Sequence, residues 1–143
     1  MKNIIKSTIS AVLILAFILC LASCAGADDK ASGLWKNATY TEDTELGSGA
    51  KTFSLEVKVE DKIITFTVHT DKDTVGEALI ENGIVSGEEG PYGLYIKVVN
   101  GMTADYDVDQ SYWAFYIDGE YAMSGVDATE IVEGAKYQLA REK

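Results

Sequence analysis

Aromatic side chains that could hold a flat ligand are concentrated in residues 92–126. This segment contains six of the eight tyrosines and one of the two tryptophans of the 143-residue chain. Within it, residues 112–117 (YWAFYI) have the β-branched and aromatic character of a strand. Alternation places Tyr112, Ala114 and Tyr116 on one face of this strand and Trp113, Phe115 and Ile117 on the other. One apolar face is needed for a core, so the tyrosine-rich face must be covered or must bind something.

This pattern defines a candidate ligand site. A tyrosine ring can lie flat on a ligand while its hydroxyl group stays in water. Trp113 serves either as a core residue or as a ligand contact, and residues 123–126 either close over the edge of a ligand or form a simple turn. The residues that we assign to the candidate site are Tyr112, Trp113, Tyr116, Tyr121, Met123, Gly125 and Val126.

Catalytic and metal-binding patterns are weak in this sequence. His69, the single histidine, falls on the polar face at the end of a predicted strand, and no nucleophile–base pair includes it. Asp105, Asp107 and Asp109 have the spacing of a calcium loop, but Gln110 and Tyr116 replace the glycine and glutamate that an EF-hand requires. We therefore expect a solvated acidic loop without a metal, and a protein that is not an enzyme and requires no cofactor.

Two strands and a helix precede the aromatic segment. Residues 52–60 alternate between apolar and polar side chains, which predicts a half-buried strand, and residues 63–70 return as its hairpin partner. Residues 74–82 predict a helix, because Thr74 and Glu77 form a capping box. Gly83 suits the left-handed position that follows the helix.

The remaining elements complete the predicted fold. Residues 85–90 are polar and predict a loop, whereas residues 94–99, 112–117 and 135–140 predict strands. Asn100-Gly101 and Asp118-Gly119 predict type I′ turns. A hairpin, a helix and then further strands indicate an α+β fold, in which one short helix packs across a β-grasp-like mixed sheet.

The amino terminus has the pattern of a secretion signal. Lys2 and Lys6 precede an apolar stretch at residues 9–21 that is short for a transmembrane helix. Leu21-Ala22-Ser23-Cys24 resembles the lipobox of bacterial lipoproteins, which implies cleavage before Cys24 and its lipidation. The alternative is an ordinary secretory signal with a chance cysteine.

The lipobox divides the chain into three parts: a signal peptide at residues 1–23, a flexible tether at residues 24–33 and a single domain at residues 34–143. We expect the mature protein outside the cytoplasm, anchored to the cell membrane by lipid. Removal of residues 1–23 leaves 10 basic and 23 acidic residues, a net charge of −13. This charge argues against nucleic acid as a partner.

Several motifs resemble the transcobalamin-like C-terminal domain family. They are Gly76-Glu77-Ala78-Leu79, Tyr92-Gly93-Leu94-Tyr95-Ile96, Val99-Asn100-Gly101-Met102, Tyr112-Trp113-Ala114-Phe115-Tyr116 and Gly125-Val126. The resemblance covers roughly residues 52–143 and implies a β-grasp module that contacts one face of a cobalamin. The α-helical half of the vitamin carriers has no counterpart in a chain of this length, so a corrinoid would meet an open surface or a site completed by a partner.

Two functions follow from these observations. The first is a surface-anchored module that captures a small molecule, with cobalamin or another corrinoid as the best guess. The second is a protein-interaction or adhesion module whose aromatic face docks a surface or transporter protein without a small-molecule ligand.

Overall fold

The computed structural model describes residues 33–143, so the predicted signal peptide, Cys24 and nearly all of the tether lie outside the described residues. None of the described helices is long and apolar enough to cross a membrane. The elements are η1 (Gly33–Asn37), β1 (Thr44–Gly47), β2 (Lys51–Val59), β3 (Lys62–Thr70), α2 (Val75–Glu81), β4 (Val85–Gly90), β5 (Gly93–Val99), β6 (Met102–Thr103), α3 (Tyr106–Asp109), β7 (Tyr112–Ile117), β8 (Glu120–Tyr121), η2 (Val126–Ala128) and β9 (Lys136–Glu142).

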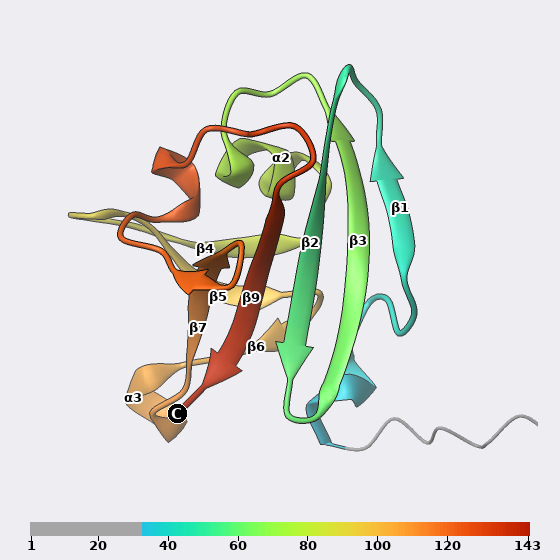
Figure 1. Cartoon of the computed structure of the whole chain (residues 1–143). Helices are drawn as coiled ribbons and strands as arrows, with labels where there is room; N and C mark the ends of the chain where they lie inside the picture. Colours follow the sequence, from blue (N-terminus) through green and yellow to red (C-terminus); the bar gives the residue numbers. More distant parts are fainter. Residues whose placement is uncertain (1–32) are drawn as a thin grey trace, which may run out of the picture. The chain divides into compact units, whose positions relative to one another are not determined.

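The strands of residues 33–143 form two sheets. A six-stranded sheet has the order β1-β3-β2-β9-β7-β8, and a three-stranded sheet has the order β4-β5-β6 (Figure 1). In the larger sheet β1 lies parallel to β3 and β2 lies parallel to β9, whereas the other pairs are antiparallel. The fold is therefore mixed α+β and predominantly β. The expectation of one mixed sheet is wrong, because β5 pairs with its neighbours in sequence, β4 and β6, instead of joining β7.

The core lies on one face of the larger sheet. Strands β2 and β3 alternate as predicted, and their inward side chains are buried together with those of α2 and β9. The register places Leu55 of β2 opposite Tyr137 of β9, and Phe115 of β7 opposite Leu139 of β9. Phe53 and Phe115 each pack their rings against Tyr137, so one tyrosine joins the two halves of the sheet.

Helix α2 begins and ends as the sequence predicts. The Thr74 hydroxyl accepts a hydrogen bond from the Glu77 amide, and the Glu77 carboxylate accepts one from the Thr74 amide, which completes the capping box. At the other end, the amides of Gly83 and Ile84 donate to the carbonyls of Ile80 and Leu79. These two bonds form a Schellman motif, with Gly83 at a φ of +67°.

The predicted loop at residues 85–90 is wrong, because this segment forms strand β4. The five residues after Val85 are all exposed, so the segment lacks the alternation of buried and exposed side chains that would predict a strand from sequence. The pairing with β5 forms it instead, with a register irregularity between Ser86 and Gly87. The two strands project as a hairpin from the rest of the domain (Figure 1).

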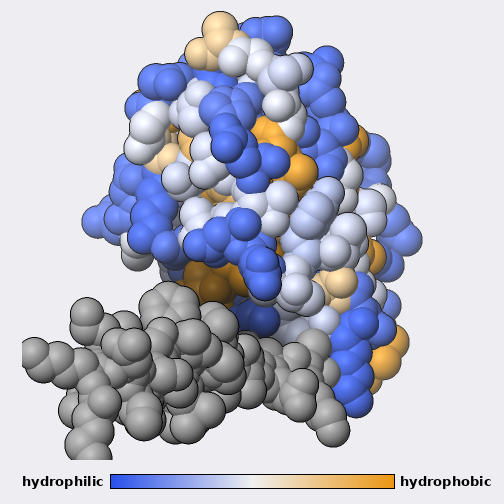
Figure 2. Space-filling model, turned by 90° about the vertical axis from the view of Figure 1, so that its right-hand side faces the viewer, coloured by the Kyte–Doolittle hydropathy of each residue, from blue (hydrophilic) through white to orange (hydrophobic). Residues whose placement is uncertain are grey.

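The segment before β1 docks on the domain. Trp35 of η1 is buried, and its indole Nε1 donates to the carbonyl of Val59 at 3.2 Å. The Tyr40 ring meets the Phe66 ring edge-on at 5.5 Å between centroids. On the face shown in Figure 2, hydrophilic residues predominate and hydrophobic ones appear as small separate spots.

Candidate functional site

Three of the predicted site residues come together on the outer face of the larger sheet. Tyr112 and Tyr116 of β7 point away from the core, because their neighbours Trp113 and Phe115 fill it. Tyr121 of β8 lies directly opposite Tyr116, and the two rings meet edge-on with centroids 5.6 Å apart. We call Tyr112, Tyr116 and Tyr121 the tyrosine face.

A single carboxylate organises two of these rings. Glu142 of β9 lies opposite Tyr112 in the β7–β9 register. The Tyr112 hydroxyl donates to Glu142 Oε2 at 3.3 Å, and the Tyr116 hydroxyl donates to Glu142 Oε1 at 2.6 Å. Both oxygens of one carboxylate therefore hold the hydroxyl ends of two neighbouring tyrosines.

The same contacts perturb the acidity of the tyrosines. The hydrogen bond to Glu142, followed by burial and the negative charge of that carboxylate, raises the pKa of Tyr116 to about 12. For Tyr112, burial comes first and the Glu142 charge second, and together they raise its pKa above the ordinary tyrosine value. Both phenols therefore remain neutral donors at physiological pH.

The other predicted site residues do not share this face. Trp113 is only 9% exposed, and its Nε1 donates to the carbonyl of Lys97, which favours the core role. Val126 of η2 is buried in the same core. Met123, two residues after Tyr121, is 98% exposed, and Gly125 lies at the start of η2. The tyrosine face therefore consists of the three tyrosines without these four residues.

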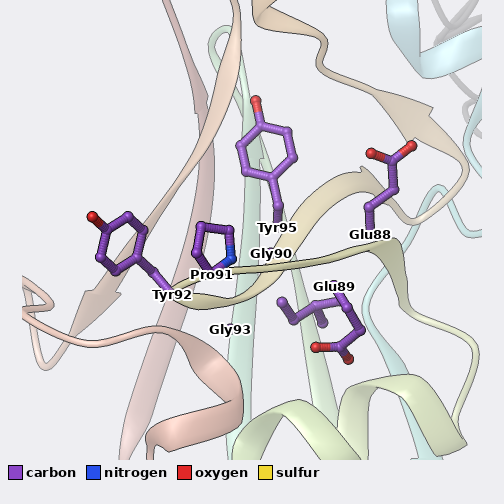
Figure 3. Close-up of a pocket in the computed structure, with 8 residues that line it drawn as sticks. Glu88, Glu89, Gly90, Pro91, Tyr92, Gly93 and Tyr95 are labelled. Atoms are coloured by element: carbon purple, nitrogen blue, oxygen red, sulfur yellow. The ribbon is translucent and has the colours of Figure 1, made fainter.

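A pocket lies on the β4–β5 hairpin, away from the tyrosine face. It encloses about 350 Å³ and is lined by residues 88–95. Figure 3 shows Tyr95, Pro91 and Glu88 on one side of the hairpin and Glu89 on the other. Tyr92 at the tip is 99% exposed. We did not assign these residues to the site from sequence, although Pro91-Tyr92 between two glycines signals an exposed turn that carries an aromatic ring.

The acidic segment at residues 105–109 is ordered by hydrogen bonds. Asp105 caps α3, a single helical turn, by accepting from the Asp107 amide. The hydroxyl of Ser111 and then the guanidinium of Arg141 hold the pKa of Asp109 down at about 2. The segment is therefore an ordered helical turn that remains exposed to solvent, since none of its residues is buried. Residues 33–143 contain no group of three or more histidine, cysteine, aspartate or glutamate side chains arranged to hold a metal.

His69 contacts side chains of the two strands that flank its own strand, β3. Its Nδ1 lies 2.9 Å from the Thr52 hydroxyl, and its Nε2 lies 2.5 Å from Glu45 Oε1. The ring therefore links β2 and β1 across β3, on the polar face where the sequence placed it.

Part of the chain matches a family model, and its fold matches a solved structure. Residues 72–139 match DUF4430, a domain of unknown function. Haptocorrin in complex with Cbi is similar at 19% identity with a TM-score of 0.50, and the alignment covers 68% of this chain and 26% of haptocorrin. This likeness shows the fold alone and agrees with the transcobalamin-like resemblance of the sequence. No curated protein matches the chain.

A second solved structure is more similar in sequence. It is a "putative metal binding protein" from Ruminococcus gnavus ATCC 29149, with 30% identity and a TM-score of 0.62. The alignment covers 66% of this chain. Since it also covers 98% of the R. gnavus protein, this chain belongs to the same family as that protein.

Proposed function

We propose that this protein binds a flat, largely apolar small molecule on its tyrosine face, with a corrinoid as the best guess. The observation that carries the proposal is the contact of Tyr112 and Tyr116 with the two oxygens of Glu142. These bonds fix two rings before any ligand arrives. Tyr121, which is 60% exposed, adds a third ring that a ligand can cover.

Fixed rings favour binding for a physical reason. A ligand binds more weakly when it must immobilise side chains, because each one loses conformational entropy worth typically about 0.5–1.5 kcal/mol. Tyr112 and Tyr116 have already lost that freedom in the free protein, because Glu142 holds their hydroxyl groups. Each buried aromatic ring contributes on the order of 150–250 Å² of contact area.

The fold supports a corrinoid as the first ligand to test. Haptocorrin, whose structure contains Cbi, shares this fold over about a quarter of its own length. The present domain offers an open surface, so we expect weaker binding than in a closed site, or a site completed by a surface or transporter protein. The proposal is of a binder and not an enzyme, and it requires no cofactor.

The proposed location is the outside of the cell membrane. The lipobox-like sequence Leu21-Ala22-Ser23-Cys24 supports lipidation of Cys24. Two or three acyl chains hold a protein stably on a membrane, whereas one holds it only marginally. In cells fed labelled fatty acid, the wild-type protein should carry the label in the detergent phase, and Cys24→Ala should lose it. Unlabelled wild-type protein cleaved at another position would refute the anchor.

Titration of the purified full chain with cobalamin tests the ligand proposal. Binding is followed by tryptophan fluorescence and calorimetry. Tyr121→Ala should weaken binding while the melting temperature stays near that of the wild type. Tyr92→Ala is the control, because it also removes an exposed tyrosine, but from the hairpin instead of the tyrosine face.

Two other results would contradict the proposal. If Tyr92→Ala abolishes binding and Tyr121→Ala does not, the ligand occupies the β4–β5 hairpin. If the wild type shows no binding at millimolar corrinoid, the corrinoid proposal fails. The protein-interaction or adhesion module then becomes the better account of the same aromatic face.

A further inference from the structure

A polar pocket adjoins the tyrosine face on the outer side of the larger sheet. It encloses about 340 Å³ and is lined by Glu56, Asp118, Gly119, Lys136 and Gln138. The register makes the two surfaces continuous, because Gln138 of β9 lies opposite Glu56 of β2 on one side and opposite Tyr116 of β7 on the other. Tyr121 of β8 continues the same row. The pocket and the tyrosine face therefore lie side by side on the same face of the sheet.

Hydrogen bonds fix the polar groups of this pocket. Gln138 Nε2 donates to Glu56 Oε2 at 2.8 Å, and Lys136 Nζ lies 2.7 Å from Glu56 Oε1. Asp118 Oδ1 accepts from the Lys136 amide at 3.1 Å. Glu56 is half-buried and has both oxygens engaged, so it orients its two partners instead of meeting a ligand itself.

The groups left facing the pocket have a specific donor and acceptor pattern. With Nε2 committed to Glu56, Gln138 presents Oε1 as an acceptor, and no donor within residues 33–143 bonds to that oxygen. Lys136 presents the remaining protons of an ammonium whose side chain is more than half exposed. The pocket thus combines a fixed neutral acceptor with a cationic donor.

We infer that this pocket binds a primary carboxamide carried at the edge of the ligand that lies on the tyrosine face. A primary carboxamide donates through nitrogen and accepts through oxygen, which matches Gln138 Oε1 and Lys136 Nζ. The inference rests on the proposed function, and it identifies the ligand class as an apolar ring with amide side arms. A carboxylate arm at the same place would meet the negative charges of Glu56 and Asp118 and would lack the N–H donors that Gln138 Oε1 requires.

The test compares two corrinoids that differ only in their side arms. The first is cobalamin, and the second is the same corrin with its peripheral amides hydrolysed to carboxylates. Each is titrated into the full chain at high salt, which screens the general repulsion between an acidic protein and an acidic ligand. We expect the wild type to bind the amide form at least about tenfold more tightly, because an unmatched polar group in a site is costly.

Variants assign that preference to the pocket. Gln138→Leu should reduce the preference for the amide form to about twofold or less, by removing the acceptor. Lys136→Met removes the donor and should act in the same direction, which keeps the test valid if one variant fails to fold. Thr67→Val is the control, since Thr67 lies on β3 opposite Ser54, outside the pocket lining, and should leave the preference unchanged.

The outcomes separate the two claims. Equal binding of both forms by the wild type, or an unchanged preference in both pocket variants, overturns the carboxamide pocket and leaves the tyrosine face as the ligand site. Failure of the wild type to bind either form overturns both claims. Loss of the preference in the pocket variants alone supports the inference.

Discussion

The amide of Leu94 donates a hydrogen bond of 3.1 Å to Asp127 Oδ2, which ties the β4–β5 hairpin to η2. The second oxygen, Asp127 Oδ1, is buried and has no partner within residues 33–143. A side chain added at Gly93 would place its Cβ 2.5 Å from Oδ2, and one added at Gly125 would lie 2.9 Å from Oδ1. Two glycines therefore make room for this carboxylate and for the bond that positions the hairpin.

Gly93→Ala should destabilise the domain by about 1 kcal/mol or more, because the new methyl group would collide with Asp127 and the backbone has a φ of +102°. Thermal unfolding measures the loss. Gly90→Ala is the control on the same hairpin, since its φ is not positive and the nearest atom to its Cβ is 3.3 Å away. Equal melting temperatures for the two variants would show that Asp127 does not constrain the hairpin.

Gly83→Val should lower stability by roughly 1 kcal/mol or more through backbone strain alone. The left-handed conformation at Gly83 disfavours a β-branched residue, and no atom lies within 4 Å of the place that a Cβ would occupy, so steric collision adds nothing. Gly83→Asn should lose much less, because asparagine tolerates this conformation. If denaturant unfolding gives the same free energy for both variants, the Schellman end does not contribute as described.

Alkaline titration should separate Tyr116 from an ordinary tyrosine. Its folded-state pKa of about 12 lies above the ordinary value, so its contribution to stability is present below pH ~10 and is lost as the pH rises through about 12. Glu142→Gln should move Tyr116 ionisation to lower pH, as measured by tyrosinate absorbance. Glu120→Gln is the control, because Glu120 pairs with Ile117 and not with Tyr116. A titration curve unchanged in Glu142→Gln would exclude the carboxylate as the cause.

Trp113→Ala should lower the free energy of unfolding by about 3–5 kcal/mol, the typical loss for a large core aromatic. The substitution also removes the indole N–H that donates to the Lys97 carbonyl. That loss is a large share of the stability of a small domain, about 5–15 kcal/mol. Tyr121→Ala, from the exposed end of the tyrosine face, should unfold close to the wild type. Similar losses for the two variants would contradict the division between core and outer face.

The sequence predicted the elements whose signals are local. The alternation of residues 52–60 and the capping box at Thr74 are confirmed, since burial on one sheet face and the bonds at a helix start depend on nearby residues. Strand β4 was missed because residues 86–90 have no buried side chain to report it, and only pairing with β5 makes it a strand. The division into two sheets was missed for the same reason.

The site was predictable only in part. Alternation along β7 assigns Tyr112 and Tyr116 to one face and Trp113 to the other, as observed. The role of Glu142 depends on the register between β7 and β9, strands separated by 18 residues, which side-chain pattern does not fix. The polar pocket beside the rings depends on the same register.

Strand β9 lies between β2 and β7, and it is the strand that connects the first hairpin to the aromatic strand. During synthesis, residues 51–121 therefore cannot assemble the six-stranded sheet until residues 136–142 have left the ribosome. Tyr137, on which Phe53 and Phe115 both pack, arrives with that strand. Until then the chain lacks the one ring that joins Phe53 to Phe115, so the two halves of the larger sheet come together only when β9 is in place.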